Sequence, residues 1–167
     1  MNLPLSVEQV INHARTRSYM DGVQRDTLRV KQTQEVFTPT AMVQELLDQL
    51  PQEIFSDPNQ NYIDNSCGDG QFLSEALIRK VENGIDFETA LSHIYGVDMM
   101  QDNVELCRQR LLCGREDLRP IVEKNIVCAD SLRYHYRFDG SYPYDDELKT
   151  IINEELKTKF FYEEKTG

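Results

Sequence analysis

Three short apolar segments each end in an aspartate, and the spacing of these acids constrains the fold more than any other feature of the sequence. The segments close at Asp64, Asp98 and Asp130, which are 34 and 32 residues apart. A strand–helix–strand unit with a right-handed crossover takes about 30 residues. We therefore expect three parallel strands in one sheet, with the acids at the edge formed by their carboxyl ends.

Helical periodicity fills the intervals between these strands. Apolar residues recur at helical spacing over residues 71–82 and 101–112, and a shorter helix is expected over 86–93. After the third strand the pattern gives way to an aromatic, irregular segment, and a final helix is expected over 146–162. The fold class is therefore α/β, with a Rossmann-like, doubly wound parallel sheet.

The N-terminal region has two helix starts. Ser6 with Gln9 fits a capping box, and Thr38 followed by Pro39 fits a helix cap with proline at the first helical position. We expect three parts: an N-terminal helical segment over 1–35, a domain over 36–144 and a C-terminal helix over 145–167.

The charge of the chain disfavours direct binding to nucleic acid. The formal net charge is −11, and residues 1–35 carry +1, so the remaining residues carry −12. Phosphate backbones are bound by cations, and a surface this acidic repels them. A role on DNA would need a partner, or the N-terminal arginines alone.

The sequence also bears on location and on metal binding. No apolar run approaches the roughly 18 residues of a membrane span, and the N-terminus lacks the features of a secretion signal. The cysteines have no C-x-x-C pair and no histidine cluster nearby: Cys67, Cys107, Cys113 and Cys128. We expect reduced thiols in a cytoplasmic protein, without a disulfide framework or a metal site.

The turn after the first expected strand reads DNSCGDG and indicates a ligand site. Gly68 and Gly70 let the backbone approach a ligand, and the following helix adds its N-terminal N–H groups. A dinucleotide would require a third glycine where Leu73 stands, and Asp64 and Asp69 place negative charge where phosphates would lie. Acids around a glycine turn favour a cationic ligand with hydroxyl and amino groups. S-adenosylmethionine fits that description.

Four segments in order carry a family resemblance. DNSCGDGQFL, GVDMMQDNVELC and NIVCADSL resemble the first three cofactor-binding motifs of class I S-adenosylmethionine-dependent methyltransferases. With EVFTPTAMVQELL upstream, the chain is similar to the N6-adenine DNA methyltransferases, including the modification subunits of type I restriction systems. The resemblance covers about residues 35–132 and implies a truncated class I methyltransferase fold. Asn65 departs from the family, which usually has proline there.

The resemblance implies cofactor-binding roles for Phe37, Thr38, Asp64, Ser66, Cys67, Gly68, Gly70, Asp98, Met99 and Asp130. In the family, the Phe-Thr-Pro segment packs on the methionine end of the cofactor. Asp98 would bind the ribose hydroxyls, Met99 would lie on the adenine face and Asp130 would bind the adenine amine. Each acid taken alone can also be a turn or cap residue, and the Phe-Thr-Pro segment can be only a helix start.

The segment SYPY resembles the family's catalytic motif, [Asp/Asn/Ser]-Pro-Pro-[aromatic]. Ser141, Pro143 and Tyr144 match it, and Tyr142 replaces the first proline. The resemblance implies that the polar residue accepts hydrogen bonds from the target amine while the aromatic ring stacks on a flipped base. The alternative is a proline-containing turn before the last helix.

Three functions stay open. The chain is an amino-methyltransferase, alone or completed by a partner, or a catalytically inactive cofactor-binding subunit that engages a restriction or methylation complex. The third alternative is a scaffold whose pocket binds nothing. In the family's strand order the first strand is central, so its edge would be open here. We therefore expect a homodimer or a partner subunit.

Overall fold

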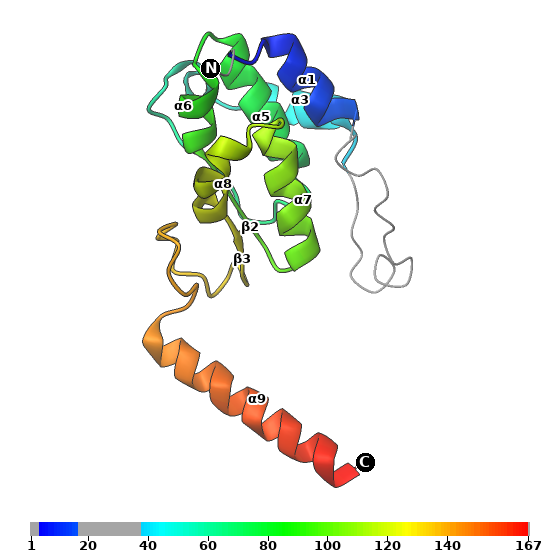
Figure 1. The fold of residues 1–167 in the computed structure, drawn as a ribbon, viewed down its shortest axis with the longest axis vertical. Helices are drawn as coiled ribbons and strands as arrows, with labels where there is room; N and C mark the ends of the chain where they lie inside the picture. Colours follow the sequence, from blue (N-terminus) through cyan, green and yellow to red (C-terminus); the bar gives the residue numbers. More distant parts are fainter. Residues whose placement is uncertain (1–3, 17–37, 167) are drawn as a thin grey trace.

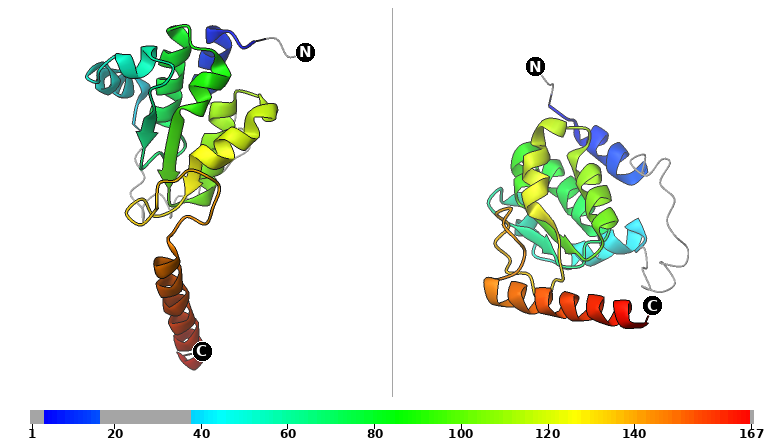
Figure 2. Two further views of the ribbon diagram at one scale, coloured as in Figure 1. Left: turned by 90° about the vertical axis from the view of Figure 1, so that its left-hand side faces the viewer. Right: turned by 60° about the horizontal axis from the view of Figure 1, so that its bottom comes forward.

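The computed structural model describes residues 4–16 and 38–166, which form a small parallel sheet with helices around it (Figures 1 and 2). In chain order the elements are α1 (Val7–Thr16), α3 (Thr40–Asp48), α4 (Glu53–Ser56), β1 (Tyr62–Asp64), α5 (Gln71–Glu82), α6 (Phe87–Ser92), β2 (Ile94–Asp98), α7 (Gln101–Leu112), the 3-10 helix η2 (Glu116–Leu118), α8 (Arg119–Asn125), β3 (Ile126–Cys128) and α9 (Asp146–Thr166). Of the segment expected over 1–35, helix α1 is described and most of the remainder lies outside the described residues.

The three strands are parallel and lie in the order β1-β2-β3. Asp64 pairs with Gly96, and Asp98 pairs with Cys128, so each strand-end acid lies two positions further along the sheet than the one before it. The prediction of an α/β fold with three parallel strands is confirmed. In the described part of the chain, β1 has β2 as its one neighbour and forms an edge of the sheet.

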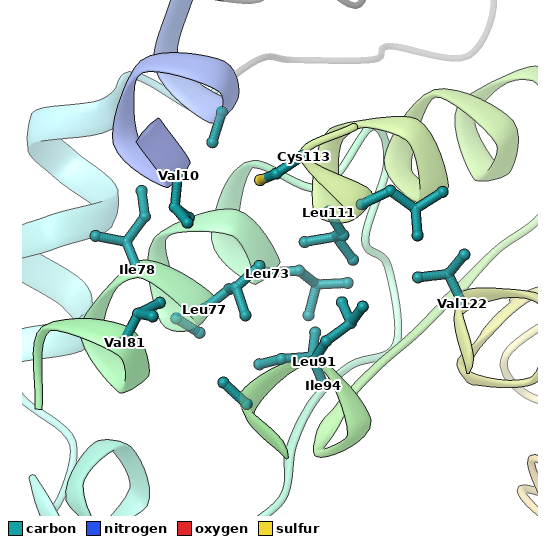
Figure 3. Packing of buried hydrophobic residues seen from close by; sticks show 14 of the residues in the cluster. Val10, Leu73, Leu77, Ile78, Val81, Leu91, Ile94, Leu111, Cys113 and Val122 are labelled. Carbon is teal, nitrogen blue, oxygen red and sulfur yellow. The ribbon is translucent and has the colours of Figure 1, made fainter. Parts of the chain in front are cut away.

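Helices α5 and α7 cover one face of the sheet. Leu73 of α5 and Leu111 of α7 lie in one buried cluster with Ile94 of β2 (Figure 3). At Gly96 an added Cβ would lie 2.6 Å from Leu73 Cδ1 and 2.9 Å from Cys67 Sγ. Glycine at position 96 therefore allows α5 and the turn before it to pack closely on β2.

The opposite face is covered by the aromatic loop, which we define as residues 131–145. The Phe138 ring lies against Tyr95 of β2 with centroids 4.8 Å apart, and Tyr134 is buried in a cluster with Val97. Side chains alternate along a strand, so Tyr95 and Val97 face away from α5 and α7. The expected irregular segment is therefore a second, smaller layer of aromatic packing.

The bounds of α5 and α7 are those that periodicity predicts. The sequence analysis does not predict α4, which has four residues and is too short to show a period. It also does not predict α8, although Pro120 in the first turn is a start signal. The expected start of α3 is wrong: Pro39 has ψ 144° and is itself the N-cap, and its carbonyl accepts the Val43 N–H at 3.1 Å.

Helix α1 is capped as predicted and is fastened to α5. The Ser6 N–H donates to Gln9 Oε1 at 2.8 Å, and the Gln9 N–H donates to Ser6 Oγ at 3.1 Å. Arg15 then donates two hydrogen bonds to the buried Glu75 carboxylate, each 2.9 Å long. This two-point pairing holds the last turn of α1 against the middle of α5.

Helix α9 leaves the end of the aromatic loop and extends away from the sheet, which the left view of Figure 2 shows. Ile152 and Leu156 of its first half line a hollow of about 340 Å³ together with Asp130 and Tyr144. Among the described residues, no helix combines the length and the apolar character needed to cross a bilayer.

Candidate functional site

The turn between β1 and α5 brings bare backbone to the carboxyl edge of the sheet. Gly70 has φ +94°, and an added Cβ there would lie 2.8 Å from Cys107 Sγ. Gly68 has φ +54°, and within the described ranges no atom lies within 4 Å of its Cβ position. Position 70 therefore requires glycine for both conformation and packing, whereas position 68 requires it for conformation and leaves open space beside the backbone.

Two carboxylates lie beside this turn. Asp64 Oδ1 accepts the Ser66 N–H at 3.0 Å, and Asp98 Oδ1 accepts the Gly68 N–H at 3.2 Å. Burial raises the pKa of Asp64 above its ordinary value of 3.8; the Ser66 hydrogen bond opposes this rise, and the charge of Asp98 adds to it. The hydrogen bond from Gly68 therefore joins the turn after β1 to the end of β2. The two carboxylates make the electrostatic potential beside the turn negative.

The Asp98 carboxylate is held in place by α7 as well as by the turn. Its Oδ2 accepts the Met100 N–H at 3.0 Å and an Asn103 side-chain N–H at 3.2 Å. A carboxylate oxygen has two lone pairs, so these two donors use the acceptor capacity of Oδ2. Sequence analysis does not single out Asn103, which is buried in the structure. Its signal in the sequence is an amide in the first turn of an expected helix, five residues after a strand-end acid.

Asp130 lies at the same edge, next to the end of β2. The Ala129 N–H donates to the Asp98 carbonyl at 2.9 Å. Asp130 Oδ1 accepts the Leu132 N–H at 3.0 Å, and Arg133 Nε lies 3.6 Å from Oδ2. The third acid is thus partly engaged by the loop that follows it.

Two exposed apolar side chains follow Asp98 and Asp130. Met99 is 68% exposed and Leu132 is 94% exposed. Single exposed apolar side chains are common on protein surfaces, so their relevance here lies in their position next to polar groups that converge on one edge. Sequence analysis picks out Met99 through the family resemblance but misses Leu132, whose only signal is its position two residues after Asp130.

The buried side chains of the glycine turn differ from what the sequence predicts. Asp69, expected among the negative charges where phosphates would lie, is instead buried, and its Oδ1 lies 3.5 Å from Nη1 of Arg110. The reason is the ion pair: a buried guanidinium requires a partner. Cys67 is buried beside Cys107, whose hydrogen bond raises the pKa of the Cys67 thiol, and burial raises it further.

The residues of the expected catalytic motif lie in the aromatic loop. The Tyr144 hydroxyl accepts the Asp130 N–H at 2.9 Å, so its ring reaches the carboxyl edge. Ser141 Oγ donates to Asp139 Oδ1 at 2.5 Å and lies 3.3 Å from His135 Nε2. The preceding Gly140 lies beside Lys124, one residue before the last of α8 and therefore near the amino end of β3. Pro143 is half-buried, and its carbonyl accepts the His135 N–H at 3.1 Å.

The segment expected to touch the methionine end is described in part. Phe37 lies outside the described residues. Thr38 is half-buried just before α3, and Thr40 Oγ1 accepts a hydrogen bond from Gln71 Nε2 at 2.9 Å. Because Gln71 is the first residue of α5, this contact brings the start of α3 next to the glycine turn.

The structure brings one group of candidate residues to the carboxyl edge and its turn: Asp64, Ser66, Cys67, Gly68, Gly70, Asp98, Met99 and Asp130. No three His, Cys, Asp or Glu side chains in the described part of the chain are arranged to hold a metal ion. No protein-family model, curated protein or solved structure matches the chain.

Proposed function

We propose that the carboxyl edge of the sheet binds S-adenosylmethionine and that the chain is a class I methyltransferase-like protein related to N6-adenine DNA methylation. The observation that carries the proposal is the hydrogen bond from the Gly68 N–H to Asp98 Oδ1. It fastens the open glycine turn to the acid that the family resemblance assigns to ribose binding. Bare backbone and a fixed carboxylate are then available to one ligand.

The donor and acceptor groups at the edge fit the chemistry of this ligand. Asp98 Oδ1 accepts one hydrogen bond from the described residues and has a second lone pair for a ribose hydroxyl. Met99 offers an exposed apolar side chain to a flat ring, and Asp130 lies two residues after the end of the neighbouring strand, where it could accept a hydrogen bond from an amine. Burial, with a smaller contribution from the charge of Asp98, raises the pKa of Asp64. The two carboxylates beside the turn favour a sulfonium and an α-ammonium group over phosphates.

The sheet order is compatible with the proposed fold. Strands β1, β2 and β3 follow one another in space as they do in sequence. In the proposed fold β1 would be central, and its second side would be covered by further strands. We propose that a second copy or a partner subunit pairs there.

The first form of the function is methyl transfer to an amino group, with Ser141, Pro143 and Tyr144 next to the target. Bound S-adenosylmethionine would supply the methyl group. The chain's own part would be to hold the target amine and to stack a base against Tyr144. With a net charge of −11, the chain would need a partner to hold DNA.

A second candidate is cofactor binding without methyl transfer, as a subunit of a restriction or methylation complex. The placement of Ser141 favours this candidate. Its hydroxyl is engaged by Asp139 and His135, and its neighbour Gly140 packs beside α8 rather than beside the glycine turn.

Isothermal titration with S-adenosylmethionine tests cofactor binding, which both candidate functions require. We expect binding by the wild-type chain and weakening by on the order of 1.5–3 kcal/mol for Asp98→Asn, because a charge-assisted hydrogen bond is lost. Asp117→Asn, which changes an exposed acid paired with Arg115 in η2, is the control and should leave affinity unchanged. Absence of binding by the wild-type chain would refute the proposal.

Transfer of tritium from labelled S-adenosylmethionine then separates the two candidates. Labelled DNA, RNA or protein would establish methyl transfer, with Ser141→Ala reducing it. Binding without transfer to any of these substrates would support the inactive subunit.

A further inference from the structure

Arg110, in the last turn of α7, is a deeply buried cation beside the glycine turn. It is 2% exposed, and within the described parts of the chain its guanidinium contacts α1, the glycine turn and the start of α5. Nε donates to the Ala14 carbonyl at 3.1 Å, Nη2 donates to Gln71 Oε1 at 2.6 Å, and Nη1 lies 3.5 Å from Asp69 Oδ1. Burying a charge is costly unless its donors are matched, so this arrangement constrains all three acceptors.

Two of the three acceptors belong to the glycine turn and its helix. Asp69 lies between Gly68 and Gly70, and Gln71 is the first residue of α5. A guanidinium is planar and presents its donors in a fixed fork, so it sets the relative positions of groups as well as their distances.

The hydrogen bonds continue from Gln71 to the start of α3. Gln71 accepts from Arg110 through Oε1 and donates to Thr40 Oγ1 through Nε2 at 2.9 Å. The same amide therefore joins the guanidinium to the start of α3, two residues after Thr38. The end of α1 is joined as well, through the Ala14 carbonyl.

We infer that Arg110 is a positioning residue that holds the Gly68–Gly70 turn in its ligand-binding conformation and couples the Thr38–Thr40 segment to it. The inference rests on the proposed function only for its effect on S-adenosylmethionine. Arg110 does not touch the open side of the turn; it acts through Asp69 and Gln71. A flexible lysine at this position cannot engage three acceptors in one plane.

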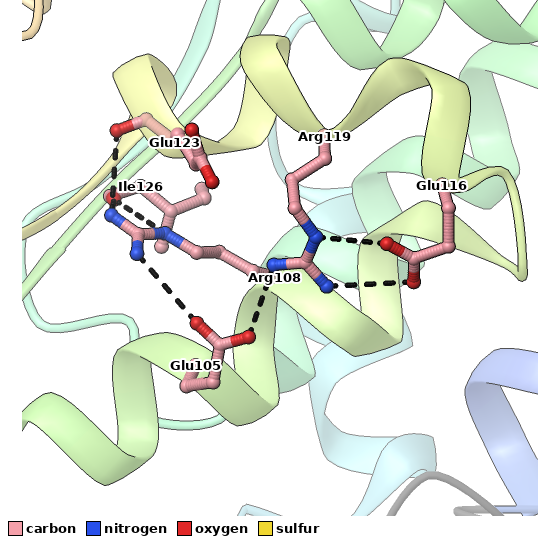
Figure 4. A network of polar contacts seen from close by, with 6 residues as sticks. All are labelled: Glu105, Arg108, Glu116, Arg119, Glu123 and Ile126. Carbon is pink, nitrogen blue, oxygen red and sulfur yellow. Dashed lines mark hydrogen bonds and ion pairs between the residues drawn. The ribbon is translucent and has the colours of Figure 1, made fainter.

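Arg108 is the matched control, because it is an arginine on the same helix that also donates to carbonyl groups. Its Nη2 donates to the Ile126 carbonyl at 2.7 Å and to the Glu123 carbonyl at 3.3 Å (Figure 4). Those acceptors lie at the end of α8 and the start of β3, away from the glycine turn. A general loss of stability caused by any change in α7 should appear in the variants at both positions. A change in the conformation of the glycine turn should appear only in the variants at position 110.

The experiment measures two quantities on Arg110→Lys, Arg110→Met and Arg108→Met in the full chain. The first is hydrogen exchange of the amides of Gly68, Gly70 and Gln71 without ligand. The second is the affinity for S-adenosylmethionine. We expect Arg110→Met to speed exchange in the turn and to weaken binding, each by about tenfold or more, with Arg110→Lys intermediate. Arg108→Met should change both by less than about twofold, because it leaves the acceptors at the turn untouched.

The outcomes are distinguishable. If the wild-type chain does not bind S-adenosylmethionine but the Arg110 variants still speed exchange in the turn, the proposed function fails and the positioning role stands. If Arg110→Met does not fold, the same two measurements on Arg110→Lys test the inference. Exchange in the turn that is unchanged in a folded Arg110 variant, or raised equally in Arg108→Met, overturns the inference.

Discussion

Two regions of the molecule are stabilised in different ways. The first, residues 62–130, holds the strands with α5 and α7. The second, residues 131–157, holds the aromatic loop and the first half of α9. In the first region Leu73 and Leu111 are fully buried, and Gly70 and Gly96 sit against sulfur and methyl groups. In the second region packing depends on tilted and edge-on contacts between aromatic rings, and Leu156 is 51% exposed. The proposed ligand edge is therefore built on the densely packed region, whereas the proposed catalytic motif lies on the loosely packed one.

The largest contrast is expected from truncating a leucine in each region. Leu111→Ala should lower the free energy of unfolding by about 2–5 kcal/mol, because it leaves a cavity between α7 and the sheet. Leu156→Ala should change it by less than about 0.5 kcal/mol, because the side chain is half-exposed on α9. Urea unfolding followed by circular dichroism measures both values. Similar costs at the two positions would remove the distinction between the regions.

Glycine substitutions test the same contrast at the backbone. Gly70→Ala should cost about 2–4 kcal/mol, because a left-handed φ and a 2.8 Å contact with Cys107 Sγ act together. Gly140→Ala has a similar φ of +80° but meets Lys124 Cγ only at 3.9 Å, so about 1–2 kcal/mol is expected. Thermal unfolding of the two variants compares them. A greater cost at Gly140 would mean that the aromatic loop is the more tightly packed segment.

The join between the two regions is tested by Tyr144→Phe. The change removes the hydroxyl that accepts the Asp130 N–H, and it should cost about 0.5–1.5 kcal/mol. Hydrogen exchange of the Asp130 amide should become faster, while exchange within α5 stays the same. An Asp130 amide that exchanges at the wild-type rate would show that this hydrogen bond does not form in solution.

The smallest effect is expected from Asp64→Asn, and it depends on pH. The folded-state pKa of Asp64 lies above its ordinary value of 3.8, so the folded chain binds this proton more tightly than the unfolded chain does. The resulting stabilisation is complete below about pH 4 and is lost as the pH rises through the folded-state pKa. Asp64→Asn should therefore gain stability relative to wild type as the pH rises above about 4. Urea unfolding of both proteins over this range measures the difference, and a difference that shrinks with rising pH would contradict the assignment.

The same contrast explains which parts of the fold the sequence predicts. Helices α5 and α7 follow from apolar periodicity, because each buries one face. The parallel sheet follows from the spacing of Asp64, Asp98 and Asp130, because a strand–helix–strand crossover has a characteristic length. The aromatic loop does not follow from any such pattern. Tyr136 and Phe138 have positive φ values of 56° and 48°, which aromatic residues rarely adopt. Ring packing and two hydrogen bonds within the loop support these conformations.

The sequence predicts those residues of the candidate site that belong to a recognisable local motif. The acids and glycines of the edge are adjacent to strand ends and can be read from the sequence. Arg110 and Asn103 reach the site from α7, so their roles depend on how the helix is rotated against the turn. Arg110 does occupy a buried position beside Leu111 and one turn after Cys107, where a charged residue is unusual and signals a buried partner.

The most direct test of the account is an amide NMR titration of the full chain with S-adenosylhomocysteine, the product form of the proposed ligand. The account predicts that the largest shifts occur at Gly68, Gly70 and Met100, with little change in α8. Shifts confined to other parts of the molecule, or no shifts at millimolar ligand, would contradict a ligand site at the carboxyl edge of the sheet.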